Sequence, residues 1–353
     1  MNYLYTCLFA FILLASCNSH AKNDDEQPNK EAKYEPEDSQ CFIFIGQDLG
    51  AVGGIEGYEE GYCDHFKTPA GVTVYLGLGG NDNKVRGLAE TANWGSGDCC
   101  ADKYIETGRF NNSMIAVGLA MVGQETQITS GGRDKNLDEI AAWIKKIAPR
   151  PVFLRIGYEF DGTDWNHYIP ETYIPAYKYI KDRFDAAGVK NVAYVWQSKG
   201  DGTPLSDMDK WYPGNDYVDW CGYSHFGQPD KVMIEFARKK GKPVFIAEST
   251  PVFQEGRTFF DADIKKPEIA RKMWDEWFTK LFRVIEESPD VVKAVSYINV
   301  NWMSQSMWID NIVFNQCDSR IQESEYVSAK WSEKMKDQRY VNADKLDWSK
   351  LPQ

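Results

Sequence analysis

The chain has 353 residues, of which 43% are hydrophobic and 14% aromatic, so it is long enough to bury a large core. Its net charge of -12 and pI near 5.0 exclude nucleic acid as a partner, because no excess of lysine and arginine is present to neutralise phosphates. A single barrel of about 250 residues with loop insertions accounts for the length.

The N-terminus has the features of a targeting segment. Residues 8–14 are apolar but too few to span a bilayer, and Leu14-Ala15-Ser16 precedes Cys17. Residues 1–17 resemble a bacterial lipoprotein signal, which implies lipidation of Cys17; a plain secretory signal is the alternative. Residues 18–40 are rich in charged residues and proline and predict a disordered acidic tether. The acidic residues 24–26 resemble surface-export signals of Bacteroidetes lipoproteins. We therefore expect an outer-membrane or cell-surface protein that contacts the membrane only through its lipid.

From residue 41 onward, short apolar runs alternate with segments of helical periodicity. The predicted strands are Cys41–Ile45, Val72–Leu78, Met114–Met121, Val152–Gly157, Val192–Trp196, Tyr217–Gly222, Pro243–Ala247 and Val292–Ile298. The predicted helices are Leu137–Ile147, Tyr173–Phe184, Val232–Ala237, Pro267–Ile285 and Ile321–Lys336. Eight repeats favour an α/β fold closed into a (β/α)8 TIM barrel, a single domain over residues 41–353, instead of an open doubly wound sheet. The glycine-rich residues 79–112 are expected to supply loops at the barrel mouth.

Two of the predicted strands are followed by a glutamate at their C-terminal end. Glu159 follows the fourth run and Glu248 follows the seventh, so the closed barrel is expected to bring both carboxylates to one mouth. Strand alternation predicts that Arg155, Gly157 and Glu159 share a face, and that Val244 and Ile246 point inward with Glu248. Burying a carboxylate costs several kcal/mol unless it is paired, so two of them at one mouth indicate chemistry. Carboxyl groups about 5 Å apart suit a retaining glycosidase.

At this point the chain resembles the retaining barrel hydrolases of glycosidase clan A, and most closely glycoside hydrolase family 26. The resemblance extends over residues 151–248 and is carried by four segments: RIGYEFDG at 155–162, VWQS at 195–198, YPGNDYVDW at 212–220, and GKPVFIAE at 241–248. Two positions differ from the family pattern, because Tyr158 replaces a histidine and Asp161 replaces an asparagine.

The resemblance implies a retaining, endo-acting glycoside hydrolase that cleaves a β-linked polysaccharide such as β-mannan, β-1,3-xylan or mixed-linkage glucan. Glu159 would be the acid/base and Glu248 the nucleophile. The further substrate-binding candidates are Arg155, Tyr158, Trp165, Trp196, Tyr223, His225 and Trp302. Packing in the core is the competing interpretation for the tryptophans. The alternative function is that of a surface glycan-binding lipoprotein that keeps the barrel without the reaction.

The remaining cysteines and histidines indicate no metal site. Cys41 and Cys221 lie in predicted strands as buried thiols, whereas Cys63, Cys99 and Cys100 lie in predicted loops, where disulfides are open to them in an exported protein. No spacing is typical of zinc, and the four histidines form no pair. We expect no metal, no cofactor, a polysaccharide or oligosaccharide partner, and a monomer.

Overall fold

The computed structural model describes residues 32–37, 39–78, 84–200, 202–252 and 262–353, which fall in one compact unit from Glu31 to Gln353. Cys17 and the rest of the predicted signal lie outside the described residues, so lipidation and export stay predictions. Among the described residues no helix has the length and apolarity needed to cross a membrane.

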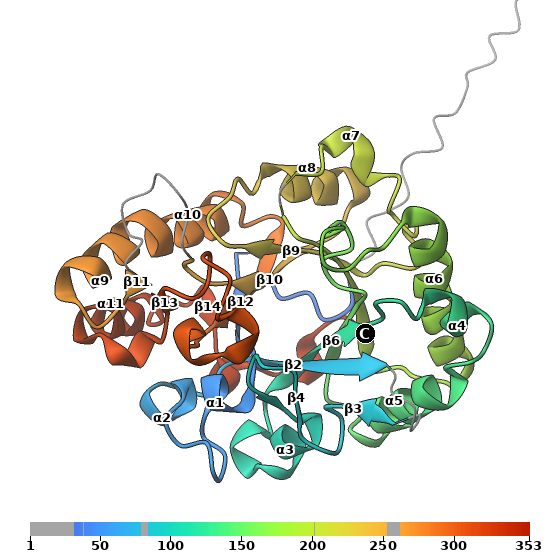
Figure 1. Ribbon diagram of the computed structural model, residues 1–353, viewed down its shortest axis with the longest axis horizontal. Coiled ribbons are helices and arrows are strands. Elements are labelled where there is room, and N and C mark those ends of the chain that lie inside the picture. Colours follow the sequence, from blue (N-terminus) through green and yellow to red (C-terminus); the bar gives the residue numbers. More distant parts are fainter. Residues whose placement is uncertain (1–31, 38, 79–83, 201, 253–261) are drawn as a thin grey trace, which may run out of the picture. The chain divides into compact units, whose positions relative to one another are not determined.

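Eight parallel strands close into a barrel, which confirms the predicted (β/α)8 fold (Figure 1). In the described part of the chain these strands are β1 (Cys41–Gly46), β2 (Gly71–Leu78), β6 (Met114–Ala120), β7 (Val152–Ile156), β8 (Val192–Ser198), β9 (Trp220–His225), β10 (Val244–Ser249) and β12 (Val292–Ile298). Their order follows the chain, and pairing of β1 with β2 closes the ring. The strand predicted at Tyr217–Gly222 is observed as β9, which begins at Trp220, three residues later than predicted. Residues 215–217 form a turn instead.

Helices connect the strands and lie outside the ring (Figure 1). They are α1 (Leu49–Val52), α2 (Tyr62–His65), α3 (Ala101–Glu106), α4 (Glu125–Thr129), α5 (Asp134–Lys146), α6 (Pro170–Ala186), α7 (Leu205–Met208), α8 (Lys231–Lys240), α9 (Pro267–Met273), α10 (Thr279–Glu287) and α11 (Glu325–Lys334). A π-helical turn at Trp274–Phe278 joins α9 to α10, so the predicted helix at Pro267–Ile285 is interrupted. The short strands are β3 (Val85–Arg86), β4 (Ala92–Asn93), β5 (Asp98–Cys99), β11 (Ala262–Asp263), β13 (Cys317–Asp318) and β14 (Tyr340–Val341).

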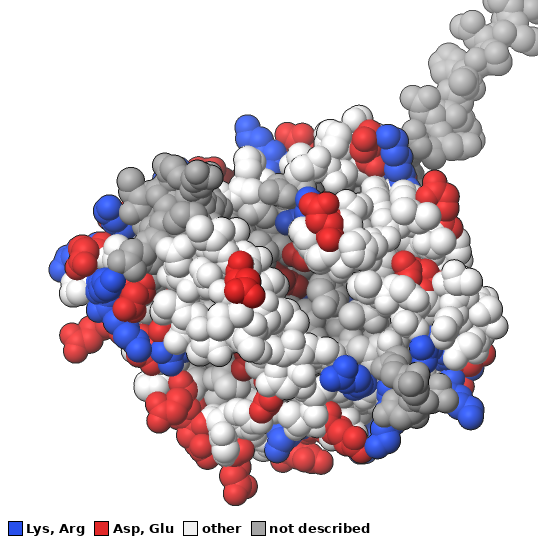
Figure 2. Space-filling model, viewed as in Figure 1, with Lys and Arg blue, Asp and Glu red and all other residues white. Residues whose placement is uncertain are grey.

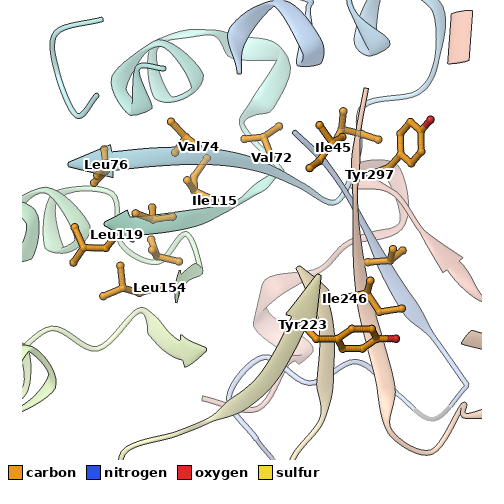
Figure 3. Close-up of a cluster of buried hydrophobic side chains, with 14 of the residues drawn as sticks. Ile45, Val72, Val74, Leu76, Ile115, Leu119, Leu154, Tyr223, Ile246 and Tyr297 are labelled. Carbon is orange, nitrogen blue, oxygen red and sulfur yellow. The ribbon is translucent and has the colours of Figure 1, made fainter. Parts of the chain in front are cut away.

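The core has two layers separated by the sheet. Outward-facing strand residues pack against the helices in a large cluster, part of which is shown in Figure 3. Inside the barrel, aromatic side chains from strands that are not neighbours pack against one another. The ring centroid of Phe44 on β1 lies 5.5 Å from that of Phe153 on β7 and 4.8 Å from that of Phe245 on β10. Such contacts are possible only across the barrel interior, so this inner cluster fills the barrel.

The end of the barrel opposite the mouth is closed by the two ends of the folded unit. Tyr34 is buried against Phe153, the Tyr34 N–H donates to the Pro352 carbonyl at 2.8 Å, and Trp220 Nε1 donates to the Lys33 carbonyl at 2.7 Å. The prediction that the disordered tether extends to residue 40 is therefore wrong for residues 32–37. These residues have few apolar neighbours in the sequence, yet the single tyrosine fills a gap that only the closed barrel creates.

The described cysteines are all buried: Cys41, Cys63, Cys99, Cys100, Cys221 and Cys317. Among the described residues, Cys63, Cys99 and Cys100 form none of the disulfides that were considered for them; the thiols of Cys99 and Cys100 instead contact backbone carbonyls. No group of three or more metal-ligating side chains occurs within the described ranges.

Candidate active site

Glu159 stands on a left-handed turn beyond the end of β7. The strand ends at Ile156, and both Gly157 and Glu159 have positive φ angles, of 53° and 52°. Asn166 Nδ2 stabilises the turn by donating to the carbonyls of Tyr158 at 3.2 Å and Glu159 at 2.8 Å. Strand alternation therefore does not extend to Glu159, and the predicted shared face fails beyond Arg155. A non-glycine residue in this conformation stores strain, which is typical of functional positions.

The Glu159 carboxylate is buried and accepts two hydrogen bonds. Ser224 Oγ donates to Oε1 at 2.6 Å, and Trp165 Nε1 donates to Oε2 at 3.1 Å. Burial, followed by the negative charge of Glu248, raises the pKa of Glu159 to about 8. A carboxyl group with this pKa holds a proton near neutral pH and is able to act as an acid.

Glu248 reaches the barrel interior because of an irregularity in β10. Ile246 pairs with Tyr223 and Glu248 pairs with Ser224, so one extra residue, Ala247, bulges between them. The prediction that Val244 and Ile246 point inward is wrong: both belong to the outer cluster, as Figure 3 shows for Ile246. The bulge changes the phase of alternation and turns the glutamate toward the interior.

The Glu248 carboxylate is held by donors. Arg155 NH1 donates to Oε1 at 2.8 Å, and Gln197 Nε2 donates to the same oxygen at 3.3 Å. Arg155 is fully buried, so this ion pair is shielded from solvent. The guanidinium balances the negative charge of the carboxylate at the position where a nucleophile is required.

The space for Arg155 comes from a glycine on the neighbouring strand. A Cβ atom at Gly118 on β6 would lie 2.8 Å from Arg155 NH2 and 2.7 Å from the ring of Tyr75. The guanidinium lies over the Tyr75 ring at 4.9 Å and over the Tyr158 ring at 5.4 Å. A Cβ atom at Gly157, by contrast, would meet Met121 and Tyr173.

Two further polar residues join the glutamates. Gln197 Nε2 donates both to Glu248 Oε1 and to Ser224 Oγ, and Ser224 Oγ donates to Glu159 Oε1. The two carboxylates are thus separated by only two hydrogen-bonding side-chain atoms, with steps of 2.6, 3.1 and 3.3 Å. Sequence reasoning missed both linking residues. Gln197 was visible in the VWQS segment, but nothing in the sequence distinguished Ser224 from its neighbours Tyr223 and His225.

Trp165 forms one wall beside Glu159. Its ring is 48% exposed, and Lys199 Nζ lies over it at 5.4 Å. Lys199 also lines a cavity of about 280 Å³, together with Asp161, Thr163, Gly202, Thr203, Pro204, Asp207, Lys210 and Trp211. Asp161 accepts from Ser198 Oγ at 2.6 Å and from the Lys199 N–H at 2.7 Å, and burial raises its pKa. The space-filling view shows a hollow near the middle of the molecule with acidic side chains inside it (Figure 2).

Three predicted substrate-binding residues face away from the mouth. Trp196 stacks on Phe160 at 4.3 Å within the outer cluster. Tyr223 lies beside Ile246 in the same cluster (Figure 3). His225 Nδ1 is 2.6 Å from Asp230 Oδ1, and its ring packs against Trp277 in the helical layer. The expectation that Tyr223 and His225 reach the mouth is wrong because the odd-numbered residues of β9 point outward and Ser224 points inward. On β8, Trp196 points outward and Gln197 points inward.

Trp302 follows β12 and is almost fully buried. Its Nε1 donates to Thr250 Oγ1 at 3.2 Å, two residues beyond Glu248, and its ring packs on Phe314 at 4.7 Å. The structure thus places Trp302 next to the end of β10. Its role in binding a sugar stays a prediction.

Comparison with known proteins identifies the family. The family model for glycosyl hydrolase family 26 matches residues 125–237. A β-1,3-xylanase of a Vibrio species is 30% identical over 328 residues, which cover 88% of this chain and 68% of that protein. The chain belongs to glycoside hydrolase family 26. A β-1,3-xylanase of an Alcaligenes species is 29% identical over 88% of the chain, which covers 66% of that protein. The chain thus spans about two thirds of the length of these two relatives.

Solved structures of other family 26 proteins share the fold. A β-mannanase of Bacteroides ovatus has a TM-score of 0.57 and 14% identity, over 87% of this chain and 91% of that one. A family 26 protein of Muricauda sp. MAR_2010_75 has a TM-score of 0.58 and 15% identity, over 89% and 91% of the two chains. At this identity the likeness establishes the barrel fold alone.

Proposed function

We propose that this family 26 protein is a retaining, endo-acting glycoside hydrolase and that β-1,3-xylan is its preferred β-linked substrate. The observation that carries the proposal is the pair of buried carboxylates at the ends of the fourth and seventh strands, joined through Ser224 and Gln197 but held in opposite electrostatic surroundings. The substrate follows from the two β-1,3-xylanases to which the chain is about 30% identical.

The two environments divide the reaction between the glutamates. In the first step Glu159 gives its proton to the glycosidic oxygen while the Glu248 carboxylate bonds to the anomeric carbon and the carbon–oxygen bond breaks. In the second step ionised Glu159 takes a proton from water, whose oxygen attacks the same carbon and releases Glu248. Two inversions retain the anomeric configuration.

The test is hydrolysis of a polysaccharide panel by wild-type protein and by the Glu159→Gln and Glu248→Gln variants. β-1,3-Xylan, β-1,4-xylan, β-mannan and mixed-linkage β-glucan are incubated, and the products are separated by chromatography. We expect a ladder of short oligosaccharides from β-1,3-xylan, a first-formed β-anomer by NMR, and a fall in kcat of at least about a thousandfold in either variant.

The control is Glu333→Gln, which changes an exposed glutamate paired with Lys336 and should leave kcat unchanged. Turnover within tenfold of wild type in either active-site variant contradicts the assignment. Binding to β-1,3-xylan without any product from any polysaccharide favours the glycan-binding alternative.

A further inference from the structure

Three fully buried polar side chains form a chain of hydrogen bonds that ends at Glu159. Arg155 NH1 donates to Gln197 Oε1 at 3.0 Å, Gln197 Nε2 donates to Ser224 Oγ at 3.1 Å, and Ser224 Oγ donates to Glu159 Oε1 at 2.6 Å. The three residues come from β7, β8 and β9, and none has any exposed surface. Bulk solvent therefore does not compete for these bonds.

The direction of every bond in this chain is fixed by its first member. A guanidinium group only donates, so the Gln197 oxygen must face Arg155 and its amide nitrogen must face the other way. The two amide hydrogens go to Ser224 Oγ and to Glu248 Oε1. Since the Ser224 oxygen already accepts from Gln197, its own hydrogen is directed at Glu159.

The two carboxyl oxygens of Glu159 consequently differ in their ability to carry a proton. A proton on Oε1 would place two hydrogens between oxygen atoms that are 2.6 Å apart, unless Ser224 turned against Gln197. Oε2 accepts from Trp165, which is half-exposed, and no second donor to Oε2 comes from the part of the barrel interior that the structure describes.

We propose that Arg155, Gln197 and Ser224 form a directional relay that holds Glu159 Oε1 as a hydrogen-bond acceptor, so that Oε2 carries and transfers the catalytic proton. Ser224 and Gln197 are positioning residues in this scheme. The transfer step rests on the proposed function, whereas the relay itself is testable without turnover.

The relay and the other groups around Glu159 have opposite effects on the pKa of this residue. Burial, the charge of Glu248 on β10 and the charge of Asp161 on the same turn all favour protonated Glu159, and Tyr158 also faces it. Ser224 and Trp165 donate to the ionised form and lower its pKa. Removal of the Ser224 hydroxyl is therefore expected to raise the pKa of Glu159.

The experiment is a titration of the glutamate side-chain carboxyl groups by NMR in full-length protein made with ¹³C-labelled glutamate, with the Glu159 signal assigned by its loss in Glu159→Gln. We expect Ser224→Ala to raise the pKa of Glu159 by about one unit. Gln197→Met should raise it as well, because an unconstrained Ser224 is able to turn and accept from protonated Glu159. In the double variant, which combines Ser224→Ala with Gln197→Met, the pKa of Glu159 should rise by no more than it does in Ser224→Ala alone. Gln197→Met serves as the independent test if Ser224→Ala does not fold.

The matched control is Ser113→Ala, which removes a fully buried serine that donates to the Pro69 carbonyl at 2.8 Å, before β6 at the other end of the barrel. Its Glu159 titration should equal that of wild type. A Glu159 pKa within about 0.3 units of wild type in Ser224→Ala, or additive shifts in the double variant, overturns the relay.

If wild type hydrolyses β-1,3-xylan, the alkaline limb of kcat/KM should lie near pH 8 and move upward with the NMR value. Shifted titration without hydrolysis by wild type supports the relay and overturns the proposed function.

Discussion

Glu159 and Glu248 carry the same functional group, and their neighbours make them different. Both carboxylates are largely buried, but Glu248 receives a guanidinium at 2.8 Å whereas Glu159 receives only neutral donors. A buried charge needs a partner, and Arg155 provides that partner for Glu248 but not for Glu159. Gly118 and the rings of Tyr75 and Tyr158 surround Arg155 and keep its guanidinium in place.

At this scale we predict the effect of Arg155→Met. Without the guanidinium, Gln197 is the one remaining donor to Glu248 among the described residues, so the buried carboxylate loses the partner that balances its charge. We expect kcat to fall at least a hundredfold and the free energy of unfolding to fall by about 3 kcal/mol, measured by hydrolysis and urea denaturation. Arg238→Met is the control, because that arginine forms an exposed pair with Asp290 and should change the free energy by less than about 1 kcal/mol. Equal effects of the two substitutions would contradict the role of Arg155.

Two local irregularities of the backbone place the glutamates. The left-handed turn after β7 carries Glu159, and the bulge in β10 carries Glu248. A regular strand in place of the bulge would turn the Glu248 carboxylate from the interior to the helical layer, whereas after β7 the strand has already ended and the left-handed turn sets the direction of Glu159. The turn depends on Gly157, whose positive φ is strained for any other residue and whose surroundings leave no room for a side chain.

The element-scale prediction compares two glycines with positive φ. Gly157→Ala would add a Cβ atom 2.6 Å from Met121 Cε and 2.8 Å from Tyr173 Cε2, so both strain and overpacking destabilise the fold by about 2–3 kcal/mol. Gly188, after α6, has φ 74° with open space around it, so Gly188→Ala should cost only about 1 kcal/mol. We also expect a loss of kcat of tenfold or more in the first variant and none in the second, measured by urea denaturation and hydrolysis. If Gly157→Ala lowered the free energy of unfolding by less than Gly188→Ala does, the proposed role of Gly157 in the turn would be refuted.

Across the whole barrel the interior changes from apolar to polar along its axis. Phe44, Phe153, Trp220 and Phe245 fill the part behind the mouth, and Arg155, Gln197, Ser224 and Glu248 follow on the same strands toward the mouth. The apolar layer excludes water from behind the ion pair, which strengthens the electrostatic contacts in front of it. Tyr34 and the C-terminal residues complete this layer from the opposite end.

The molecule-scale prediction concerns where the folded unit begins. A chain that starts at residue 41 loses Tyr34 and its contact with Phe153, and it exposes Trp220 Nε1, which is bonded to the Lys33 carbonyl. We expect its free energy of unfolding to fall by about 2–4 kcal/mol relative to a chain that starts at residue 31, with similar kcat where both are folded. Urea denaturation of the two chains measures this difference. Identical midpoints would show that residues 32–40 belong to the tether, as the sequence suggested.

The amino-acid sequence by itself determined the barrel, its strand order and the two glutamates, because these follow from local signals. Short apolar runs, helical periodicity and a glutamate at the end of a run are all contained within about ten residues of sequence. The eight predicted strands overlap the observed ones; Glu159 follows the fourth of them and Glu248 lies near the end of the seventh.

Only the tertiary structure decided which side chains surround those glutamates. Regular alternation along β8 and β9 makes Trp196, Tyr223 and His225 face the helices and Ser224 face the site, whereas a bulge in β10 decides the direction of Glu248. The decisive bonds also join residues far apart in the chain, such as Arg155 and Glu248, which are 93 positions apart. Closure of the ring is what brings such residues together, and no local pattern encodes the atoms that then meet.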